Sequence, residues 1–497
     1  MFQICCLQHT RLLSLLCVTA LPLARAWLNS SGSDLISTTT RLPVRLRCVN
    51  WYGAHLHTFV AGGLDKRSCG EIAESVRQLG ANCVRIPLSV EMVLTNPLPP
   101  ASAVAALNAS ECIAHSALEV LDCQVRELTK RGLMVILNSH NSFPGWVGAH
   151  QAKPQGLWHT EQFPTYAWVA SLVALAFRYK SNALVVGIDI RNEIHDQDGV
   201  VITWGKSNDT DSDWKAATLL ADAALREVNP NVLVIVSGLC CAYDLRAMQD
   251  LENYRSKYVF TTHVYIFSWW FTHVNWALVL CLSLFFVACN TAAAFWLRRH
   301  QRLYTAVQSF KSDWLYALAG SILLPLCLVA VSIVWMLQAK RAGCSSIAAD
   351  AVQTLVLGAV WLAAVAGACC TLLANENEVN WRKLTTRFCC CNTCLGLVQA
   401  GLSVFYQTHW AVAWDLRRWN SPNIPVWVGE FGAEIGDTSV QWKWLLMYLA
   451  DMHYAYWPLN GCFFPLRFNK LINDTYGILE CDWTTVRNTN WTASIFA

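Results

Sequence analysis

Short apolar segments alternate with helical stretches in two separate parts of the chain. Most are continuous apolar runs, which is typical of strands buried on both faces of a parallel sheet. Amphipathic helices lie between them, for example at 69–80 and 213–230. Eight strands that alternate with helices predict a TIM (β/α)8 barrel of the α/β class. The predicted strands are VRLRCVNW (44–51), ANCVRIP (81–87), LMVILNSH (133–140), VVGIDIRNE (185–193), VLVIVSGL (232–239), YVFTTHVY (258–265), PVWVGEFG (425–432) and YAYWPLNG (454–461).

One interval is too long for a barrel connection, the one between the sixth and seventh predicted strands. It contains four runs without Asp, Glu, Lys or Arg. Each run is long enough to cross a bilayer, which takes about 20 apolar residues. We therefore predict that a four-helix transmembrane insert interrupts the barrel between strand 6 and helix 6. Its spans are predicted at about 274–297, 314–339, 351–375 and 388–407.

The fourth predicted span is the weakest on hydropathy, since its run contains Gln399, Gln407 and His409. Parity supports it. The sixth and seventh strands belong to one barrel, so the chain must return to the side of the membrane that it left. The barrel is then expected in two parts, at 27–273 and 408–497.

The N-terminal segment 1–26 has the pattern of a signal peptide. A lone Arg11 precedes an apolar core, and Ala24-Arg25-Ala26 supplies a small-x-small cleavage site. The alternative is an uncleaved anchor helix. In both cases we expect the barrel on the luminal or extracellular side of a multi-pass membrane protein, in the plasma membrane or the secretory pathway.

Composition and charge agree with a chain that lies partly in lipid. Charged residues make up 14%, hydrophobic residues 54%, and the mean hydropathy is +0.31. The connectors 298–313 and 376–387 are rich in Arg and Lys, as the positive-inside rule prefers for cytosolic loops. A net charge of +3 gives no reason to expect a nucleic-acid partner. Glycosylation sequons flank the insert at Asn29, Asn108, Asn208, Asn473 and Asn490.

Two groups stand out among the 22 cysteines. Nine lie in segments predicted to be luminal, where disulfides are possible, but their pairing does not follow from the sequence. A second cluster opens the fourth predicted span on its cytosolic side, where S-palmitoylation, a zinc site or a purely structural role are the alternatives. The nine are Cys48, Cys69, Cys83, Cys112, Cys123, Cys240, Cys241, Cys462 and Cys481, and the cluster is Cys389, Cys390, Cys391 and Cys394.

Two carboxylates stand where the predicted strands end. Glu193 ends the fourth strand in RNE, and Glu430 lies near the end of the seventh in VGEFG. Barrels of this kind keep their active sites at the carboxyl ends of the strands. Glycoside hydrolysis usually needs two carboxylates, one to protonate the leaving oxygen and one to attack the sugar or activate water. Outside the cysteine cluster no metal-ligand spacing is evident, so we expect no metal and no cofactor.

With their neighbours, these residues resemble glycoside hydrolase family 5, the cellulase family, and its plant-type members in particular. The resemblance covers Val44 to Tyr265 and Pro425 to about Trp491, but not the insert. The motifs that carry it are VNW with His55-Leu56 and Gly63-Leu64, NCVRIP, NSHN, RNE, HVY, GEFG, YAYWPLNG and YGILECDWTTVRN.

The resemblance implies a retaining double displacement in which Glu193 is the acid/base and Glu430 the nucleophile. Asn192 would hold the sugar 2-hydroxyl, while Arg85 and Tyr265 would keep Glu430 ionised and oriented. Further substrate-binding residues are His140, His263 and Trp457, the last as the floor of the subsite, together with Trp51 and His55. Asn138 departs from the acidic residue that plant-type members carry there, which puts that support of the pocket in doubt.

The implied substrate is a β-linked glycan, a β-glucan or β-glucoside. Because the insert follows a βα loop at the active-site face, a membrane-associated glycolipid such as glucosylceramide or a steryl glucoside is the alternative. A carbohydrate-binding surface protein without catalysis is a third reading, disfavoured because a binder does not need both Glu193 and Glu430. A transporter is disfavoured because the predicted spans hold no buried charge.

Overall fold

The fold is described from a computed structural model of the chain. The residues that the structure describes are 27–107, 112, 115–146, 155–248, 257–265, 329–330, 332–334, 336–337, 343–344, 352, 424–463 and 472–497.

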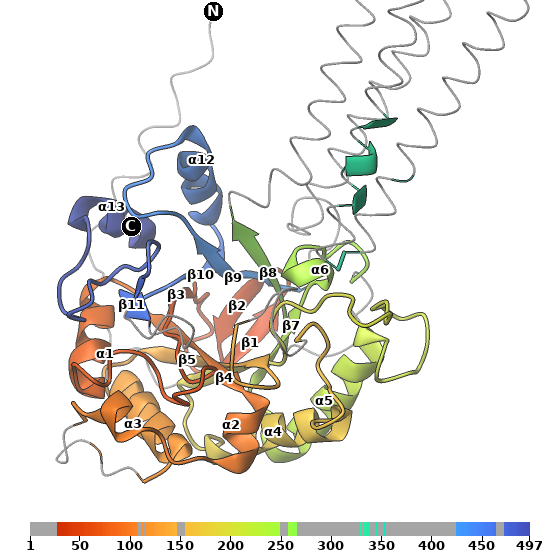
Figure 1. The fold of residues 1–497 in the computed structure, drawn as a ribbon, viewed down its shortest axis with the longest axis horizontal. Coiled ribbons are helices and arrows are strands. Elements are labelled where there is room, and N and C mark those ends of the chain that lie inside the picture. Colours follow the sequence, from red (N-terminus) through yellow and green to blue (C-terminus); the bar gives the residue numbers. More distant parts are fainter. Residues whose placement is uncertain are drawn as a thin grey trace, which may run out of the picture.

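Eight parallel strands close into a barrel in the order β10-β3-β4-β5-β6-β7-β8-β9 (Figure 1). All eight predicted strands are present and follow one another around the barrel in chain order, so the prediction of a (β/α)8 barrel is confirmed. The barrel strands are β3 (Arg47–Asn50), β4 (Cys83–Ser89), β5 (Met134–Asn141), β6 (Val185–Asp189), β7 (Leu233–Ser237), β8 (Tyr258–Tyr265), β9 (Val426–Gly432) and β10 (His453–Tyr456).

Helices lie outside the strands in the described part of the chain, as Figure 1 shows. Trp158, which lies in a loop, packs with the helix residues Trp168 and Trp214, with ring centroids 4.9 to 6.3 Å apart. Trp168 and Trp214 donate their indole N–H to the carbonyls of Ile190 and Ser237, at the carboxyl ends of β6 and β7. The helices therefore position the strand ends. Their bounds are α1 (Cys69–Gln78), α2 (Val90–Thr95), the 3-10 turn η1 (Ala101–Val104), α3 (Ala117–Lys130), α4 (Thr165–Arg178), α5 (Trp214–Val228), α6 (Leu239–Ala242), α12 (Val440–Leu449) and α13 (Thr489–Phe496).

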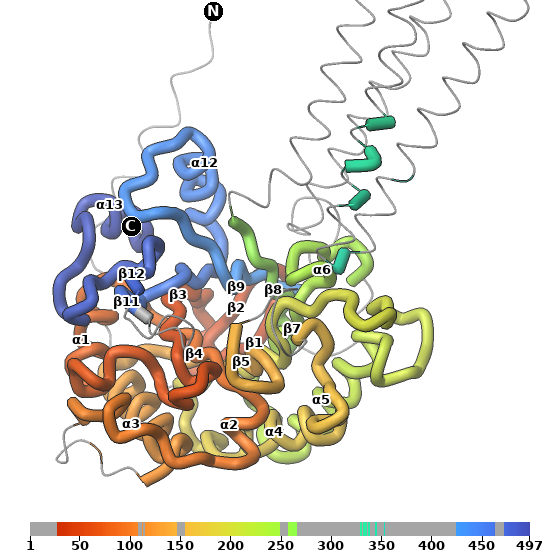
Figure 2. The backbone as a smooth tube through the Cα atoms, in the orientation of Figure 1, coloured from red at the N-terminus to blue at the C-terminus, as the bar shows by residue number. Residues whose placement is uncertain are grey.

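A hairpin that was not predicted covers the N-terminal end of the barrel. Its strands β1 (Leu28–Ser31) and β2 (Asp34–Ser37) pair antiparallel. Leu28 and Leu35 are buried in one cluster with interior barrel residues such as Ile136 and Ile235. A further small sheet, β11 (Cys462–Phe463) with β12 (Ile472–Asn473), follows the last barrel strand (Figure 2).

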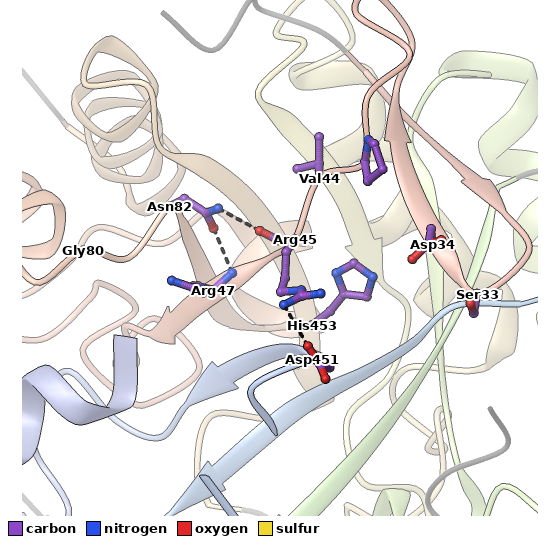
Figure 3. Close-up of a pocket in the computed structure, with 10 residues that line it drawn as sticks. Ser33, Asp34, Val44, Arg45, Arg47, Gly80, Asn82, Asp451 and His453 are labelled. Atoms are coloured by element: carbon purple, nitrogen blue, oxygen red, sulfur yellow. Dashed lines mark hydrogen bonds and ion pairs between the residues drawn. The ribbon is translucent and has the colours of Figure 1, made fainter. Parts of the chain in front are cut away.

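A cavity of about 420 Å³ lies at this same N-terminal end (Figure 3). The residues that line it already bond to one another: Asn82 donates to the Arg45 carbonyl and accepts from the Arg47 amide. Arg45 also reaches Asp451 at 3.5 Å, and His453 accepts from the backbone of Leu46. In barrels of this kind, residues at the N-terminal end usually serve stability, whereas the active site lies at the opposite end.

Strand ends differ from the prediction at two places that matter for the site. Strand β6 ends at Asp189, so Glu193 lies in the loop beyond the strand rather than at its end. Strand β10 covers only His453–Tyr456, and the predicted remainder up to residue 461 is not strand. The chain leaves the β ladder early at both places, which frees the following residues to turn across the mouth of the barrel.

Strands β8 and β9 are neighbours, with Phe260 opposite Val426 and Tyr265 opposite Gly432. The long interval between them in sequence is therefore an insertion into an intact barrel. The four predicted spans lie almost entirely outside the described residues, as do the segment 1–26, Asn108 and the Cys389–Cys394 cluster. Among the residues that are described, no helix is long and apolar enough to span a membrane.

Four disulfides join described cysteines: Cys48–Cys83, Cys112–Cys123, Cys240–Cys344 and Cys462–Cys481. The first links β3 to β4 across the barrel interior, where the two residues are direct register partners. Cys344 lies in the predicted insert and is not one of the nine cysteines for which disulfides are expected. Of the predicted glycosylation sites, Asn208, Asn473 and Asn490 are exposed, and Asn29 lies within β1.

The interior cluster predicts a stability effect. Replacing the fully buried Ile235 with Ala removes apolar contacts from the centre of the barrel. We expect the free energy of unfolding to fall by about 2–5 kcal/mol, with a lower midpoint of thermal unfolding. Leu42→Ala is the control, since that side chain is 64% exposed and its removal should change the midpoint little. Equal midpoints for both variants would contradict this packing.

Candidate active site

Polar side chains gather at the carboxyl end of the barrel, on strands that are otherwise apolar. Arg85 comes from β4, His140 from β5, Asp189 from β6, and Glu430 from β9. Because all eight strands run parallel, their carboxyl ends meet at the same end of the barrel. The site is therefore assembled from residues far apart in sequence.

Arg85 is the centre of this arrangement and is completely buried. Its Nη1 donates to Glu430 Oε1 at 2.6 Å and to Asn50 Oδ1 at 3.1 Å. Its Nε donates to Asp189 Oδ2 at 2.9 Å, and its Nη2 to Asn192 Oδ1 at 2.7 Å. The planar guanidinium thus orients a carboxylate and an amide of the site at the same time.

Glu430 accepts a second hydrogen bond on its other oxygen. The Tyr265 hydroxyl donates to Oε2 at 2.9 Å, while Arg85 holds Oε1. Both oxygens of the Glu430 side chain are therefore fixed in position. Burial beside Glu430 and Glu193 raises the pKa of Tyr265 well above its ordinary value, so the phenol keeps its proton and remains a donor.

Glu193 occupies a different environment. Its carboxyl contacts His263, whose Nδ1 lies 2.8 Å from Oε1. Burial raises the pKa of Glu193 to about 7, with His195 and Arg85 acting in the opposite direction. The side chain is nevertheless 23% exposed, so it remains accessible to a ligand. Near neutral pH this carboxyl holds and releases a proton readily.

The backbone of Glu193 lies in an uncommon conformation, with φ of +27°. Positive φ values are unfavourable for side chains other than glycine and are found where the surrounding structure imposes them. Asn192 is held by Arg85 and by the Ser139 carbonyl, to which its amide donates at 3.0 Å. The loop after β6 is thereby turned so that Asn192 and Glu193 both face the site.

His263 lies between the two glutamates. Its Nδ1 is 3.7 Å from Glu430 Oε2 in addition to the contact with Glu193. Burial lowers the pKa of His263 to about 4, so the ring is neutral at neutral pH. A neutral Nδ1 accepts from protonated Glu193 or, in the other tautomer, donates to the carboxylate. The His263 ring can therefore keep its hydrogen bond to Glu193 whether that carboxyl is protonated or charged.

The two glutamates are close together. One oxygen of Glu193, a ring nitrogen of His263 and one oxygen of Glu430 all lie within 4.8 Å of one another. Carboxyl groups about 5 Å apart are typical of retaining glycosidases, whereas inverting enzymes separate them by roughly 6.5–9.5 Å. The same three atoms are a possible metal-ligand set, but Arg85 already supplies positive charge 2.6 Å from Glu430.

An aromatic surface borders the carboxylates. Trp457 lies nearly parallel to Tyr52 and to His140, with interplanar angles of 14° and centroid distances of 5.2 and 5.8 Å. Trp146 packs edge-on against Tyr52 at 5.2 Å. Trp457 is only half-buried. Such a surface suits the apolar face of a sugar ring.

His140 is held by two amides. Its Nδ1 lies 2.8 Å from Asn138 Oδ1, and its Nε2 lies 3.5 Å from the Asn192 amide nitrogen. Burial, with the nearby His55 and Arg85, lowers the pKa of His140 well below its ordinary value. The neutral amide of Asn138 is enough to orient this neutral ring. His140 therefore keeps a hydrogen-bond partner although position 138 is not acidic.

The structure brings together most of the residues predicted for the site: Arg85, His140, Asn192, Glu193, His263, Tyr265, Glu430 and Trp457. Trp51 and His55 are different, since both are fully buried. Trp51 donates its indole N–H to the Gly62 carbonyl at 2.8 Å, and His55 packs against His140. In this structure these two residues support the site from behind and expose no surface to a sugar. The individual binding roles stay predictions.

Three residues of the site were not predicted. Asp189 is buried beside Arg85, and burial raises its pKa to about 6. Its signal in the sequence is a lone acidic residue within the apolar run VVGID. Tyr52 and Trp146 join the aromatic surface, and among 14 tyrosines and 24 tryptophans nothing in the sequence singles them out.

A closed parallel barrel with two glutamates at retaining separation on its carboxyl end defines a glycoside-hydrolase type of site. A family model described as cellulase, glycosyl hydrolase family 5, matches residues 44–313, more than half of the chain. The chain belongs to this family.

Relatives and solved structures agree with the family. An endoglucanase of Paenibacillus polymyxa is 30% identical over 191 residues, 38% of this chain and 45% of that protein. A glycosyl hydrolase 5 family protein of Chamaecyparis obtusa is 32% identical over 270 residues, 51% of this chain and 46% of that protein. The chain thus spans less than half the length of these relatives. The catalytic domain of the major endoglucanase from Xanthomonas campestris pv. campestris shares the fold, with a TM-score of 0.55, 18% identity and coverage of 95% and 99% of the two chains.

The raised pKa of Glu193 predicts a dependence of stability on pH. Because folding raises this pKa from 4.5 to about 7, the stabilising contribution is complete below the pKa of the unfolded chain and is lost as the pH rises through 7. In Glu193→Gln this loss is absent. Between pH 5 and pH 8 we expect the free energy of unfolding of the unaltered protein to fall by about 3 kcal/mol relative to that of the variant.

Thermal unfolding at the two pH values measures the difference. Glu161→Gln, at an exposed glutamate, is the matched control and should follow the unaltered protein at both. A stability difference between Glu193→Gln and the unaltered protein that does not change with pH would contradict a buried, protonated Glu193.

Proposed function

We propose that this protein is a retaining β-glycoside hydrolase that acts on a β-glucan or β-glucoside. The observation that carries the proposal is the pair of glutamates within 4.8 Å in unlike environments. Glu430 accepts hydrogen bonds from Arg85 and Tyr265, whereas the pKa of Glu193 is raised to about 7. Environments that separate two carboxyl groups in this way assign the nucleophile and the acid.

In the first step, a Glu430 oxygen attacks the anomeric carbon of the sugar while Glu193 gives its proton to the leaving oxygen. The glycosidic bond breaks, and an ester bond forms between the sugar and Glu430. In the second step, Glu193, now a carboxylate, takes a proton from water as the water oxygen attacks the same carbon. Glu430 leaves as a carboxylate, again held by Arg85, and Glu193 is protonated once more.

The neighbouring residues fit the needs of both steps. Arg85 holds Oδ1 of Asn192, which leaves the side-chain NH2, 3.5 Å from His140 Nε2, as the group that donates to a sugar hydroxyl. Trp457 offers an aromatic face for the sugar ring. Endoglucanases among the relatives support a glucan substrate. The match with the Chamaecyparis obtusa protein supports the likeness to plant-type members.

The proposal includes an insert with four membrane crossings. Support comes from the four uncharged runs and from the adjacency of β8 and β9, which requires an even number of crossings between Tyr265 and Val426. Residues Ile333, Val334 and Leu337 fall in the second predicted span; they are helical, and 40%, 54% and 47% exposed. Exposed apolar side chains on a helix suit a lipid environment.

The disulfide Cys240–Cys344 adds support for this topology. It joins the stretch between the second and third predicted spans to the barrel, so the chain returns to the barrel after two crossings and again after four. Four disulfides among the described cysteines fit an oxidising luminal or extracellular compartment. We propose a multi-pass membrane protein with the barrel on that side, glycosylated at its exposed sequons.

Glu430→Gln tests the catalytic assignment. Removal of the nucleophile should lower turnover of 2,4-dinitrophenyl β-cellobioside by at least about 10³-fold, because the covalent intermediate can no longer form. The matched control is Glu434→Gln, at an exposed glutamate four residues further on, which should retain activity. Thermal unfolding establishes that both variants fold. A Glu430→Gln variant with normal turnover would overturn the assignment.

The membrane-proximal site raises the alternative that the substrate is a glycolipid. Full-length protein purified in detergent should be assayed on soluble β-glucans, glucosylceramide and a steryl glucoside. We expect turnover of the soluble glucans, as the family suggests. Turnover of the glycolipids alone would replace the glucan proposal, and activity on glucans alone would remove the glycolipid alternative. If the folded protein hydrolyses none of these substrates, the result would favour a carbohydrate-binding protein.

A further inference from the structure

Two residues of the insert contact the barrel directly behind the acid/base. Cys344 forms a disulfide with Cys240 of α6, with their Cα atoms 4.8 Å apart. The carbonyl of Gly343 accepts a hydrogen bond from the Asp196 amide at 2.9 Å. Figures 1 and 2 show described residues of this part of the chain beside α6. Asp196 lies three residues beyond Glu193, so the insert reaches the loop that carries the acid/base.

That loop, residues 193–196, is held by backbone contacts along its length. The Ile194 carbonyl accepts from the Cys241 amide at 2.8 Å, and the His195 amide donates to the Gly156 carbonyl at 3.0 Å. The His195 ring is bonded to the Glu193 carbonyl at 2.8 Å. Among the described residues, the contact from Gly343 comes from the insert and holds the far end of the loop at Asp196.

The fit between Gly343 and the loop is tight. A Cβ added at Gly343 would lie 2.6 Å from the Asp196 carbonyl oxygen and 3.1 Å from Cδ2 of His195. The residue also has φ of +67°, which favours glycine. No larger residue fits here unless the loop shifts, so Gly343 packs against the loop as closely as a backbone can.

The disulfide restrains the same loop through α6. Cys240, Cys241 and Ala242 have φ values of 56°, 57° and 63°, three consecutive residues in the left-handed region. Such conformations persist only where surrounding structure holds them. The bond to Cys344 restrains Cys240, and the Cys241 amide in turn bonds to Ile194. Burial raises the pKa of the Cys241 thiol well above its ordinary value, which makes it a poor nucleophile toward the neighbouring disulfide.

We propose that Gly343 and Cys344 are positioning residues for Glu193, and that the insert is locked onto the barrel to hold the acid/base against the leaving group. The inference rests on the proposed function. It gives the insert a role in the chemistry besides that of an anchor. The disulfide restrains the loop through α6, and the Gly343 carbonyl holds it through Asp196.

A leaving-group comparison separates positioning of the acid from general loss of structure. Departure of 2,4-dinitrophenolate needs little protonation, whereas departure of a sugar alcohol from cellotetraose depends on the acid. In the full-length Cys240→Ser/Cys344→Ser variant we expect kcat/KM on cellotetraose to fall about 10-fold or more. On 2,4-dinitrophenyl β-cellobioside it should change less than about 3-fold. Cys112→Ser/Cys123→Ser, which removes a disulfide elsewhere, should leave the ratio of the two values unchanged.

Gly343→Ala tests the second contact without removing the disulfide. It should produce the same selective loss on cellotetraose. Its matched control is Gly132→Ala, since Gly132 also has a positive φ, of +78°, but has no atom within 4 Å of an added Cβ. Equal losses on both substrates in the insert variants, or no loss on either, would overturn the proposal.

Hydrogen exchange gives a readout that does not require turnover. We expect the amide of Asp196 to exchange faster in Cys240→Ser/Cys344→Ser and in Gly343→Ala than in the unaltered protein, because its acceptor at Gly343 is displaced. Unchanged exchange would overturn the inference by itself. Absence of hydrolysis by the unaltered protein, on either substrate, would instead contradict the proposed function.

Discussion

Arg85 is a cation without exposed surface, placed between the carboxylates of Asp189 and Glu430. A buried charge is costly unless its partners surround it, and removal of one partner leaves the others uncompensated. Here the guanidinium makes four hydrogen bonds, to Asn50, Asp189, Asn192 and Glu430. The closed barrel makes this possible, because it brings β3, β6 with its following loop, and β9 within reach of one side chain of β4. The geometry of the whole site depends on that contact set.

From this contact follows the difference between the two glutamates. Glu430 lies beside the cation and accepts from Tyr265, so both of its oxygens are held. Glu193 lies in the loop after β6, where its carboxyl contacts the neutral ring of His263 and burial dominates its pKa. A single arginine, placed nearer to one carboxyl than to the other, thus gives the two carboxyl groups unlike environments, and the proposed roles of nucleophile and acid rest on this difference.

The sequence predicted the barrel well, because continuous apolar runs bounded by helices have few other interpretations. The placement of Glu193 and Glu430 in one site was predictable because a motif coincides with a predicted strand end at both, although β6 itself ends at Asp189. Asp189 was not, since a buried ion pair with Arg85 depends on which strands become neighbours. The link from Cys344 to Cys240 was not predictable either, because cysteine pairing follows from spatial proximity and these residues lie 104 positions apart. The insert's spans stay predictions.

The most direct test of a double displacement by Glu193 and Glu430 is the configuration of the first product. Proton NMR can follow the anomeric signal during hydrolysis of a β-linked cellooligosaccharide by the full-length protein, before mutarotation. Two successive inversions at the anomeric carbon should release the β-anomer first. Initial release of the α-anomer would require a single displacement by water and would contradict the account, since these carboxyl oxygens lie closer together than the roughly 6.5–9.5 Å that is typical of inverting enzymes.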